Sequence, residues 1–230
     1  MEWINFLVGN TFISVGDFNV RQKMGIPMGT NAAPQIADLY LLAQEIRFMK
    51  ENIRGRFSIC FNLRYVYRYL DDITIINDKG CFSKEIGSIY DNCLDLSKVN
   101  SSPLEAEVLD ISVRISDGSA ITTVFDKRKS FNFRVNQLPA ADSNIAIATM
   151  YSVFYSQLIR IARICSHQEG FIYSCQELVQ LLSSKGYSRR KMKDKFLQFF
   201  RKKDSLVAKY GTLSPETLWI TVSKRNTLDQ

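Results

Sequence analysis

Two adjacent aspartates, Asp71 and Asp72, interrupt a hydrophobic stretch that reads YRYLDDITII over residues 67–76. Successive side chains of a β-strand point to opposite faces, so a strand through this stretch would bury one of the two charges at high cost. At the tip of a tight hairpin both carboxylates reach one side of the protein, where they repel each other unless a cation lies beside them. Mg²⁺, or Mn²⁺, suits such a pair because it takes oxygen ligands and completes its shell with water and phosphates. The stretch therefore predicts a metal-binding hairpin, with an ordinary aspartate-rich turn as the alternative.

A basic segment is the second candidate for chemistry. Residues 185–203 contain nine lysines and arginines and one acid, Asp194, whereas the whole chain has a formal net charge of +7. Such a local excess predicts a polyanion partner, either nucleic acid or anionic lipid, and a solvated surface helix is the alternative. At helical spacing three of the lysines share one face, and Met192, Phe196 and Phe199 fall on another. The candidate nucleic-acid contacts are Arg189, Arg190, Lys191, Lys195 and Lys202.

Composition argues against several classes of protein. With 46% hydrophobic residues the chain is globular. Its five cysteines form no CxxC pair, and the one histidine, His167, lacks the further ligands of a zinc site. No run approaches the roughly 20 apolar residues that span a bilayer, and the N-terminus has Glu2 where a secretory signal carries positive charge. We therefore expect an intracellular protein, nuclear or cytoplasmic, with no membrane segment.

The elements that must position these residues indicate an α+β fold. Gly16-Asp17 and Asp117-Gly118 each separate two β-prone runs, which predicts two further hairpins. A Gly/Pro-rich loop ending near Pro34 leads into a helix over residues 35–49. From Ile145 the strand signal gives way to three helices, so a domain boundary is expected near Asn144. The expected organisation is a mixed domain over 1–144, a helical subdomain over 145–210 and an unassigned tail over 211–230.

Three segments in order resemble one family. The tetrapeptide YLDD at 69–72 fits the Y-x-D-D hairpin of reverse transcriptases, and MGIPMGTNAAP at 24–34 resembles their Gly-x-Pro loop. The segments 108–145 and 151–166 look like those that follow the catalytic hairpin in Penelope-like retroelement reverse transcriptases. The chain thus resembles such an enzyme from about residue 12 to about residue 210. The resemblance implies a partial polymerase palm, an antiparallel sheet with packed helices, followed by an all-helical thumb-like subdomain.

The resemblance also implies an activity and site residues. The family is an RNA-directed DNA polymerase that transfers nucleotides with two metal ions, and its partners are an RNA template, a DNA primer and a deoxynucleoside triphosphate. Asp71 would be the metal-binding aspartate and Asp72 its lesser partner. Residues 131–139 would grip the primer end. The nucleotide and template pocket would be formed by Gln22, Gly25, Pro27, Gly29, Thr30 and Tyr69.

One departure from the family pattern concerns the metal. The family needs a third carboxylate before the Gly/Pro loop, and Glu2 and Asp17, the acids that precede Gly25, are not credible substitutes. This chain alone is therefore expected to bind divalent metal weakly and to be inactive. Either it is a portion of a polymerase that becomes catalytic once joined to its missing half, or it is a non-catalytic remnant that at most binds nucleic acid. An anionic-lipid-binding domain is a third possibility.

Overall fold

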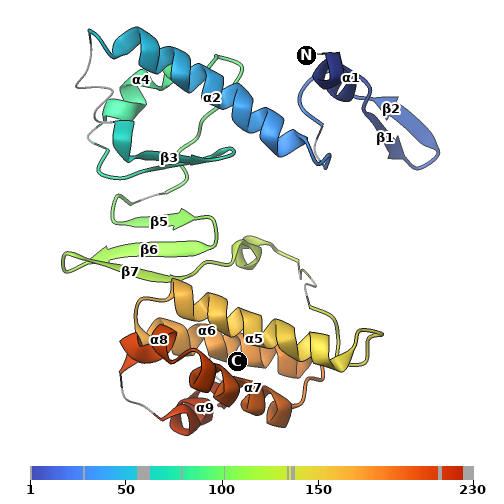
Figure 1. The fold of residues 1–230 in the computed structure, drawn as a ribbon, viewed down its shortest axis with the longest axis vertical. Coiled ribbons are helices and arrows are strands. Elements are labelled where there is room, and N and C mark those ends of the chain that lie inside the picture. The colour runs from blue at the N-terminus through green and yellow to red at the C-terminus, as the bar shows by residue number, and fades with distance from the viewer. Residues whose placement is uncertain are drawn as a thin grey trace. The chain divides into compact units, whose positions relative to one another are not determined.

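The computed structural model describes residues 2–27, 29–55, 63–78, 80–100, 102–133, 135, 138–211 and 214–224 (Figure 1). The chain divides into two compact units, an N-terminal unit, Met1–Ser97, and a C-terminal unit, Lys98–Gln230. No helix among the described residues is both long enough and apolar enough to cross a membrane.

The described residues of the N-terminal unit form two hairpins, one long α-helix and two shorter ones. Gly16, with φ +59°, lies in the turn of the first hairpin, as the sequence predicts. Pro34 lies in the first turn of the long helix, where its missing N–H costs nothing. The elements in order are α1 (Glu2–Gly9), β1 (Phe12–Val15), β2 (Phe18–Arg21), α2 (Ala33–Asn52), η1 (Leu63–Tyr65), β3 (Val66–Tyr69), β4 (Asp72–Ile75) and α4 (Cys81–Ile89).

The core of the N-terminal unit lies between α2, α4 and the second hairpin. Phe48 of α2 and Phe82 of α4 are buried, and Val66, Ile73 and Ile75 of the hairpin pack against the same cluster. Alternate residues of a strand share a face, so the packing of these aliphatic side chains leaves the other side of the hairpin in solvent. The YLDD turn is thus attached to a small hydrophobic core.

The C-terminal unit combines a three-stranded antiparallel sheet with helices. Asp117 and Gly118, with φ +50° and +74°, form the expected two-residue turn between two strands. The three helices predicted after Ile145 are α5, α6 and α7, and a further helix, α9, lies in the tail left unassigned from sequence. The elements in order are β5 (Glu105–Val108), β6 (Ile111–Ser116), β7 (Ser119–Val124), η2 (Lys127–Ser130), α5 (Ile147–Ile164), α6 (Gln168–Ser184), α7 (Arg189–Lys202), α8 (Asp204–Val207), η3 (Ala208–Tyr210) and α9 (Pro215–Ser223).

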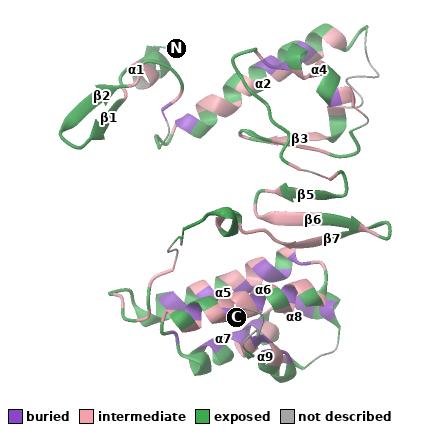
Figure 2. Cartoon of the chain, turned by 180° about the vertical axis from the view of Figure 1, so that it is seen from behind, coloured by how far each residue is buried: buried purple, intermediate pink, exposed green. Residues whose placement is uncertain are grey.

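Buried residues recur along these helices (Figure 2), and the core that they form is rich in aromatic side chains. Phe171 of α6 is fully buried, with its ring centroid 4.8 Å from that of Tyr210 and 6.4 Å from that of Phe199 on α7. Trp219 of α9 lies 5.4 Å from Phe196, centroid to centroid. Each of these side chains buries a large apolar area, so the core fixes α7 between its neighbours.

The sheet and the helices of the C-terminal unit are joined directly. The Ser166 N–H donates to the Thr122 carbonyl at 3.0 Å, and the Thr122 N–H donates to Ser166 Oγ at 2.9 Å. Val124 of β7 also packs against the helical core. β7 and the loop between α5 and α6 thus belong to the same compact unit, which begins at Lys98. The domain boundary expected near Asn144 stays a prediction.

The α+β class is confirmed, and a polymerase palm is not. The strands that the structure describes form three separate antiparallel sheets, β1–β2, β3–β4 and β5–β6–β7. Each strand pairs with its neighbour in sequence across a tight turn, as in isolated hairpins. The described part of the chain therefore does not confirm the antiparallel palm sheet that the resemblance implied.

A glycine in α6 tests the contact between sheet and helices. A Cβ atom on Gly170 would lie 2.8 Å from Thr123 Cγ2 of β7, closer than van der Waals contact allows. We expect Gly170→Ala to destabilise the C-terminal unit by about 1–2 kcal/mol, because overpacking outweighs the gain in helix propensity. With Thr123→Ser, which removes Cγ2, the same substitution should instead stabilise by up to about 1 kcal/mol. Urea unfolding of the parent, the two single variants and the double variant measures both changes in stability. If Gly170→Ala changed the free energy of unfolding equally with Thr123 and with Ser at position 123, the contact would be refuted.

Candidate nucleic-acid interface

Helices α6 and α7 are joined by a tight turn. The Gly186 N–H donates to the Ser183 carbonyl at 3.1 Å, and the Tyr187 N–H donates to the Leu182 carbonyl at 3.0 Å. Gly186 adopts φ +83°, which other residues rarely do, so it suits the end of a helix. Tyr187 is buried and Ser188 immediately precedes α7. The result is two consecutive helices with a short, well-anchored turn.

Helix α7 has one buried face and one charged face, as its sequence predicts. Met192, Phe196 and Phe199 are fully buried against the rest of the unit. The arginines and lysines of α7 lie on the remaining surface, and among the described residues none of them forms an ion pair with an acid. Their positive charge is therefore available to a partner.

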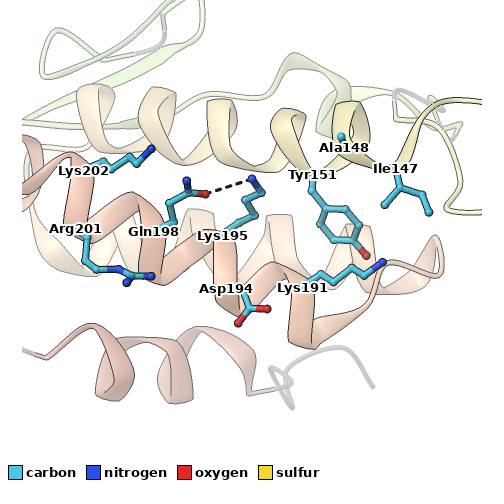
Figure 3. A pocket seen from close by; sticks show the side chains of 9 residues that line it. All are labelled: Ile147, Ala148, Tyr151, Lys191, Asp194, Lys195, Gln198, Arg201 and Lys202. Atoms are coloured by element: carbon cyan, nitrogen blue, oxygen red, sulfur yellow. Dashed lines mark hydrogen bonds between the residues drawn. The ribbon is translucent and has the colours of Figure 1, made fainter.

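A groove of about 690 Å³ runs between α5 and α7 (Figure 3). Lys191, Lys195 and Lys202 line it, as expected for residues on one helical face, and Arg201 joins them. Arg189 and Arg190 are exposed but lie outside it. The full lining consists of Ile147, Ala148, Tyr151, Lys191, Asp194, Lys195, Gln198, Arg201 and Lys202. Four cations therefore face one acid, which makes the groove strongly positive.

Tyr151 of α5 holds the start of α7. Its hydroxyl accepts a hydrogen bond from the Ser188 N–H at 2.9 Å, and its ring meets that of Tyr187 edge-on at 5.4 Å. The Lys191 ammonium lies 5.6 Å from the centroid of the same ring. Sequence analysis missed Tyr151, because its contacts form only once α5 packs beside α7.

The hairpin aspartates lie where the sequence predicts. Leu70 and Asp71 form the turn, Leu70 has φ +55°, and Asp72 pairs with Tyr69 at the start of β4. Both carboxylates are exposed, and the described residues offer neither of them a hydrogen-bond donor. No cluster of three or more potential metal ligands occurs among the residues described. Weak binding of a divalent metal by this pair stays a prediction.

An arginine beneath the turn fixes its position, a feature that sequence analysis also missed. The Arg68 side chain, only 9% exposed, donates to Glu45 at 2.5 Å, to Asp38 at 2.6 Å and to the Leu70 carbonyl at 3.2 Å. The hydrogen bond with Glu45 is the largest contribution that raises the pKa of the guanidinium above its ordinary value. Burial, and then a hydrogen bond to Glu45, raises the pKa of Tyr90. The turn is thus anchored to α2 through two acids, Glu45 and Asp38, that precede Arg68 by 23 and 30 residues in sequence.

The other residues assigned to a nucleotide pocket form local contacts. Gln22 Nε2 donates to the Met24 carbonyl at 2.8 Å, and Thr30 Oγ1 donates to the Pro27 carbonyl at 3.3 Å. Gly25 and Gly29 have φ +85° and +89°, which suits a loop, and Tyr69 is exposed. Met28 is outside the described residues. That this loop and the hairpin aspartates share a pocket stays a prediction.

The segment expected to grip a primer is only partly described, since residues 134, 136 and 137 fall outside the described ranges. Phe131 and Phe133 are exposed and stack in parallel at 5.2 Å, centroid to centroid. Lys129, just before them, is paired with Glu177 at 2.5 Å. Its charge is thus already compensated, unlike the charges on α7.

We expect Mg²⁺ to bind at the hairpin with a Kd of about 1 mM or weaker, because two carboxylates alone hold this ion poorly. Isothermal titration with MgCl₂ measures the affinity. Asp71→Asn is the matched control and should abolish the heat of Mg²⁺ binding. Stoichiometric micromolar binding of two ions would contradict this expectation and reveal a further ligand.

Comparison with known proteins gives one finding. A family model described as an animal helix-turn-helix domain matches residues 137–196, which include α5, α6 and the first half of α7. No curated protein and no solved structure matches the chain. A helix-turn-helix is a nucleic-acid-binding type of domain, which agrees with the expectation of a nucleic-acid partner.

The resemblance to a Penelope-like reverse transcriptase is therefore wrong. The matched family is a helix-turn-helix family, and its residues are the ones that the resemblance assigned to a polymerase thumb. The short motifs led to a wrong family prediction because each also occurs for an ordinary structural reason. The YLDD tetrapeptide forms a two-residue hairpin turn, and the Gly/Pro segment leads into the first turn of α2.

Proposed function

We propose that the C-terminal unit binds double-stranded DNA and that α7 is the helix that contacts it. In helix-turn-helix proteins the first helix crosses the DNA backbone and the second lies in the major groove. We assign α6 and α7 to these two helices because of their order and the short turn between them, both within or overlapping the matched range. The observation that carries the proposal is that the basic residues gather on the second of these helices.

The chemistry of α7 favours phosphate contacts. Lysine and arginine displace condensed counterions from DNA, which gives affinity that falls as salt rises. The charged face of α7 offers mostly lysine and arginine, and its one amide, Gln198, is engaged with Lys195 at 3.2 Å. Bidentate amides are the usual readers of adenine, so we expect little discrimination in favour of adenine, whereas arginine and lysine can read guanine.

The same geometry argues against the lipid-binding alternative. An interfacial helix needs an exposed apolar face that enters the membrane. Three of the five apolar residues of α7, Met192, Phe196 and Phe199, are fully buried in the core instead, and Leu197 and Phe200 are partly buried.

The proposal is tested by fluorescence anisotropy of a labelled 20-base-pair DNA duplex titrated with the full chain. We expect saturable binding at 0.1 M salt that needs no Mg²⁺ and that exceeds binding to the corresponding single strand. An RNA–DNA hybrid and phosphatidylserine vesicles are the comparison ligands. Binding to the vesicles without binding to the duplex would overturn the proposal.

A further inference from the structure

We infer that the groove between α5 and α7 holds the sugar–phosphate backbone of one DNA strand. This assignment rests on the proposed function and deepens it, because it divides α7 into two sides. The groove side, with Lys191, Lys195 and Lys202, supplies the salt-dependent part of the affinity. The outer side, with Arg189, Arg190 and Lys193, contributes little to it.

The dimensions of the groove suit a nucleic-acid strand. Lys191 and Lys202 are separated by eleven residues, about 16 Å along a helix axis. Consecutive phosphates lie farther apart along a strand than their axial rise of about 3.4 Å, so this length accommodates a few phosphates of one strand. Opposite the cations, α5 presents Ile147, Ala148 and the ring of Tyr151 (Figure 3). One wall therefore suits phosphates and the other suits the less polar sugars.

Two of the groove cations, Lys191 and Lys195, are held in place without being neutralised. Lys195 donates to Gln198 Oε1 at 3.2 Å, and Lys191 lies over the ring of Tyr151. Both partners are uncharged, so they restrict the lysines and leave their charge available for a polyanion. Asp194 is the single acid in the lining.

Several cations of the C-terminal unit outside α7 are compensated, unlike those of the groove. Four of them form close ion pairs with acids, at distances of 2.5–2.8 Å. The pairs are Arg114–Glu105, Arg128–Asp126, Lys129–Glu177 and Arg160–Asp110. The positive field of the unit is therefore concentrated on α7, and the groove is where α7 provides walls as well as charge.

The test compares two triple variants that remove the same charge from the same helix. The groove triple is Lys191→Gln, Lys195→Gln and Lys202→Gln, and the outer triple is Arg189→Gln, Arg190→Gln and Lys193→Gln. For a 20-base-pair duplex the slope of log K against log salt should become shallower by about two to three in the groove triple. It should change by less than about one in the outer triple. An equal or larger change in the outer triple would overturn the groove assignment.

A pair of substitutions on α5 tests the groove without altering α7. Ala148 lines the groove and Thr149 does not, and both are exposed in the first turn of α5. Ala148→Glu should lower duplex affinity by about tenfold at 0.1 M salt, since it opposes roughly one phosphate contact. Thr149→Glu, which adds the same charge on the same helical turn, should lower it by less than about threefold. Equal losses of duplex affinity in Ala148→Glu and Thr149→Glu would contradict the groove assignment, even if the groove triple did not fold.

The outcomes separate the two proposals. If both triples keep the parental slope, α7 is not the DNA-binding surface and the proposed function fails with the groove. If the slope of log K against log salt becomes shallower in the outer triple alone, the proposed function stands and the groove assignment fails. Far-UV circular dichroism of each variant confirms that α7 remains helical.

Discussion

Replacing all four groove cations by glutamine lowers duplex affinity by about a thousandfold or more at 0.1 M salt. The variant is Lys191→Gln, Lys195→Gln, Arg201→Gln and Lys202→Gln. Each phosphate contact contributes a slope of roughly −0.9, which corresponds to about eightfold in affinity between 1 M and 0.1 M salt. Multiplying the factors in affinity of four such contacts gives the expected loss. Competition anisotropy with the labelled duplex measures it.

A matched control separates the groove from net charge. Lys23, Lys50, Lys84 and Lys98 are exposed and form no ion pair that the described residues show. Replacing these four by glutamine removes the same total charge away from the groove, and duplex affinity should fall by less than about tenfold. Similar losses in the two quadruple variants would show that only the overall charge of the chain matters.

Phe171→Ala lowers the stability of the C-terminal unit by about 3–5 kcal/mol, the largest stability effect that we expect. The side chain is fully buried and its ring packs against those of Phe199, Phe200 and Tyr210. Truncation removes its transfer free energy and leaves a cavity beneath α7. The thermal midpoint of this unit should fall by roughly 10–20 °C.

Hydrogen exchange localises that effect. Amides of α5, α6 and α7 should lose protection in Phe171→Ala, whereas those of α2 should keep theirs, because α2 belongs to the other compact unit. Phe171→Leu is the conservative control and should lose much less stability. Equal loss of protection in α2 would show that the two units unfold together.

Local patterns were sufficient to predict many elements. Tight turns at Gly16-Asp17 and Asp117-Gly118 follow from residues that tolerate positive φ. The two faces of α7 follow from the spacing of Met192, Phe196 and Phe199 among basic residues. The three lysines expected on one face line one groove, because helical spacing fixes their relation before any packing occurs.

Contacts between distant segments could not be predicted in the same way. The Arg68 network depends on α2 packing beneath a hairpin, and the Tyr151 contacts depend on α5 packing beside α7. The boundary expected near Asn144 marks where strands give way to helices, but β7 bonds to the loop after α5 across more than 40 residues. A change of element type is therefore not a change of compact unit.

The salt dependence of duplex binding by the unmodified chain tests the central claim most directly. Between 50 and 200 mM salt, log K for the 20-base-pair DNA duplex should fall against log salt with a slope of about −3 to −4, as four phosphate contacts require. Absence of binding, or a slope shallower than about −1, would contradict the account of α7 as a DNA-binding helix.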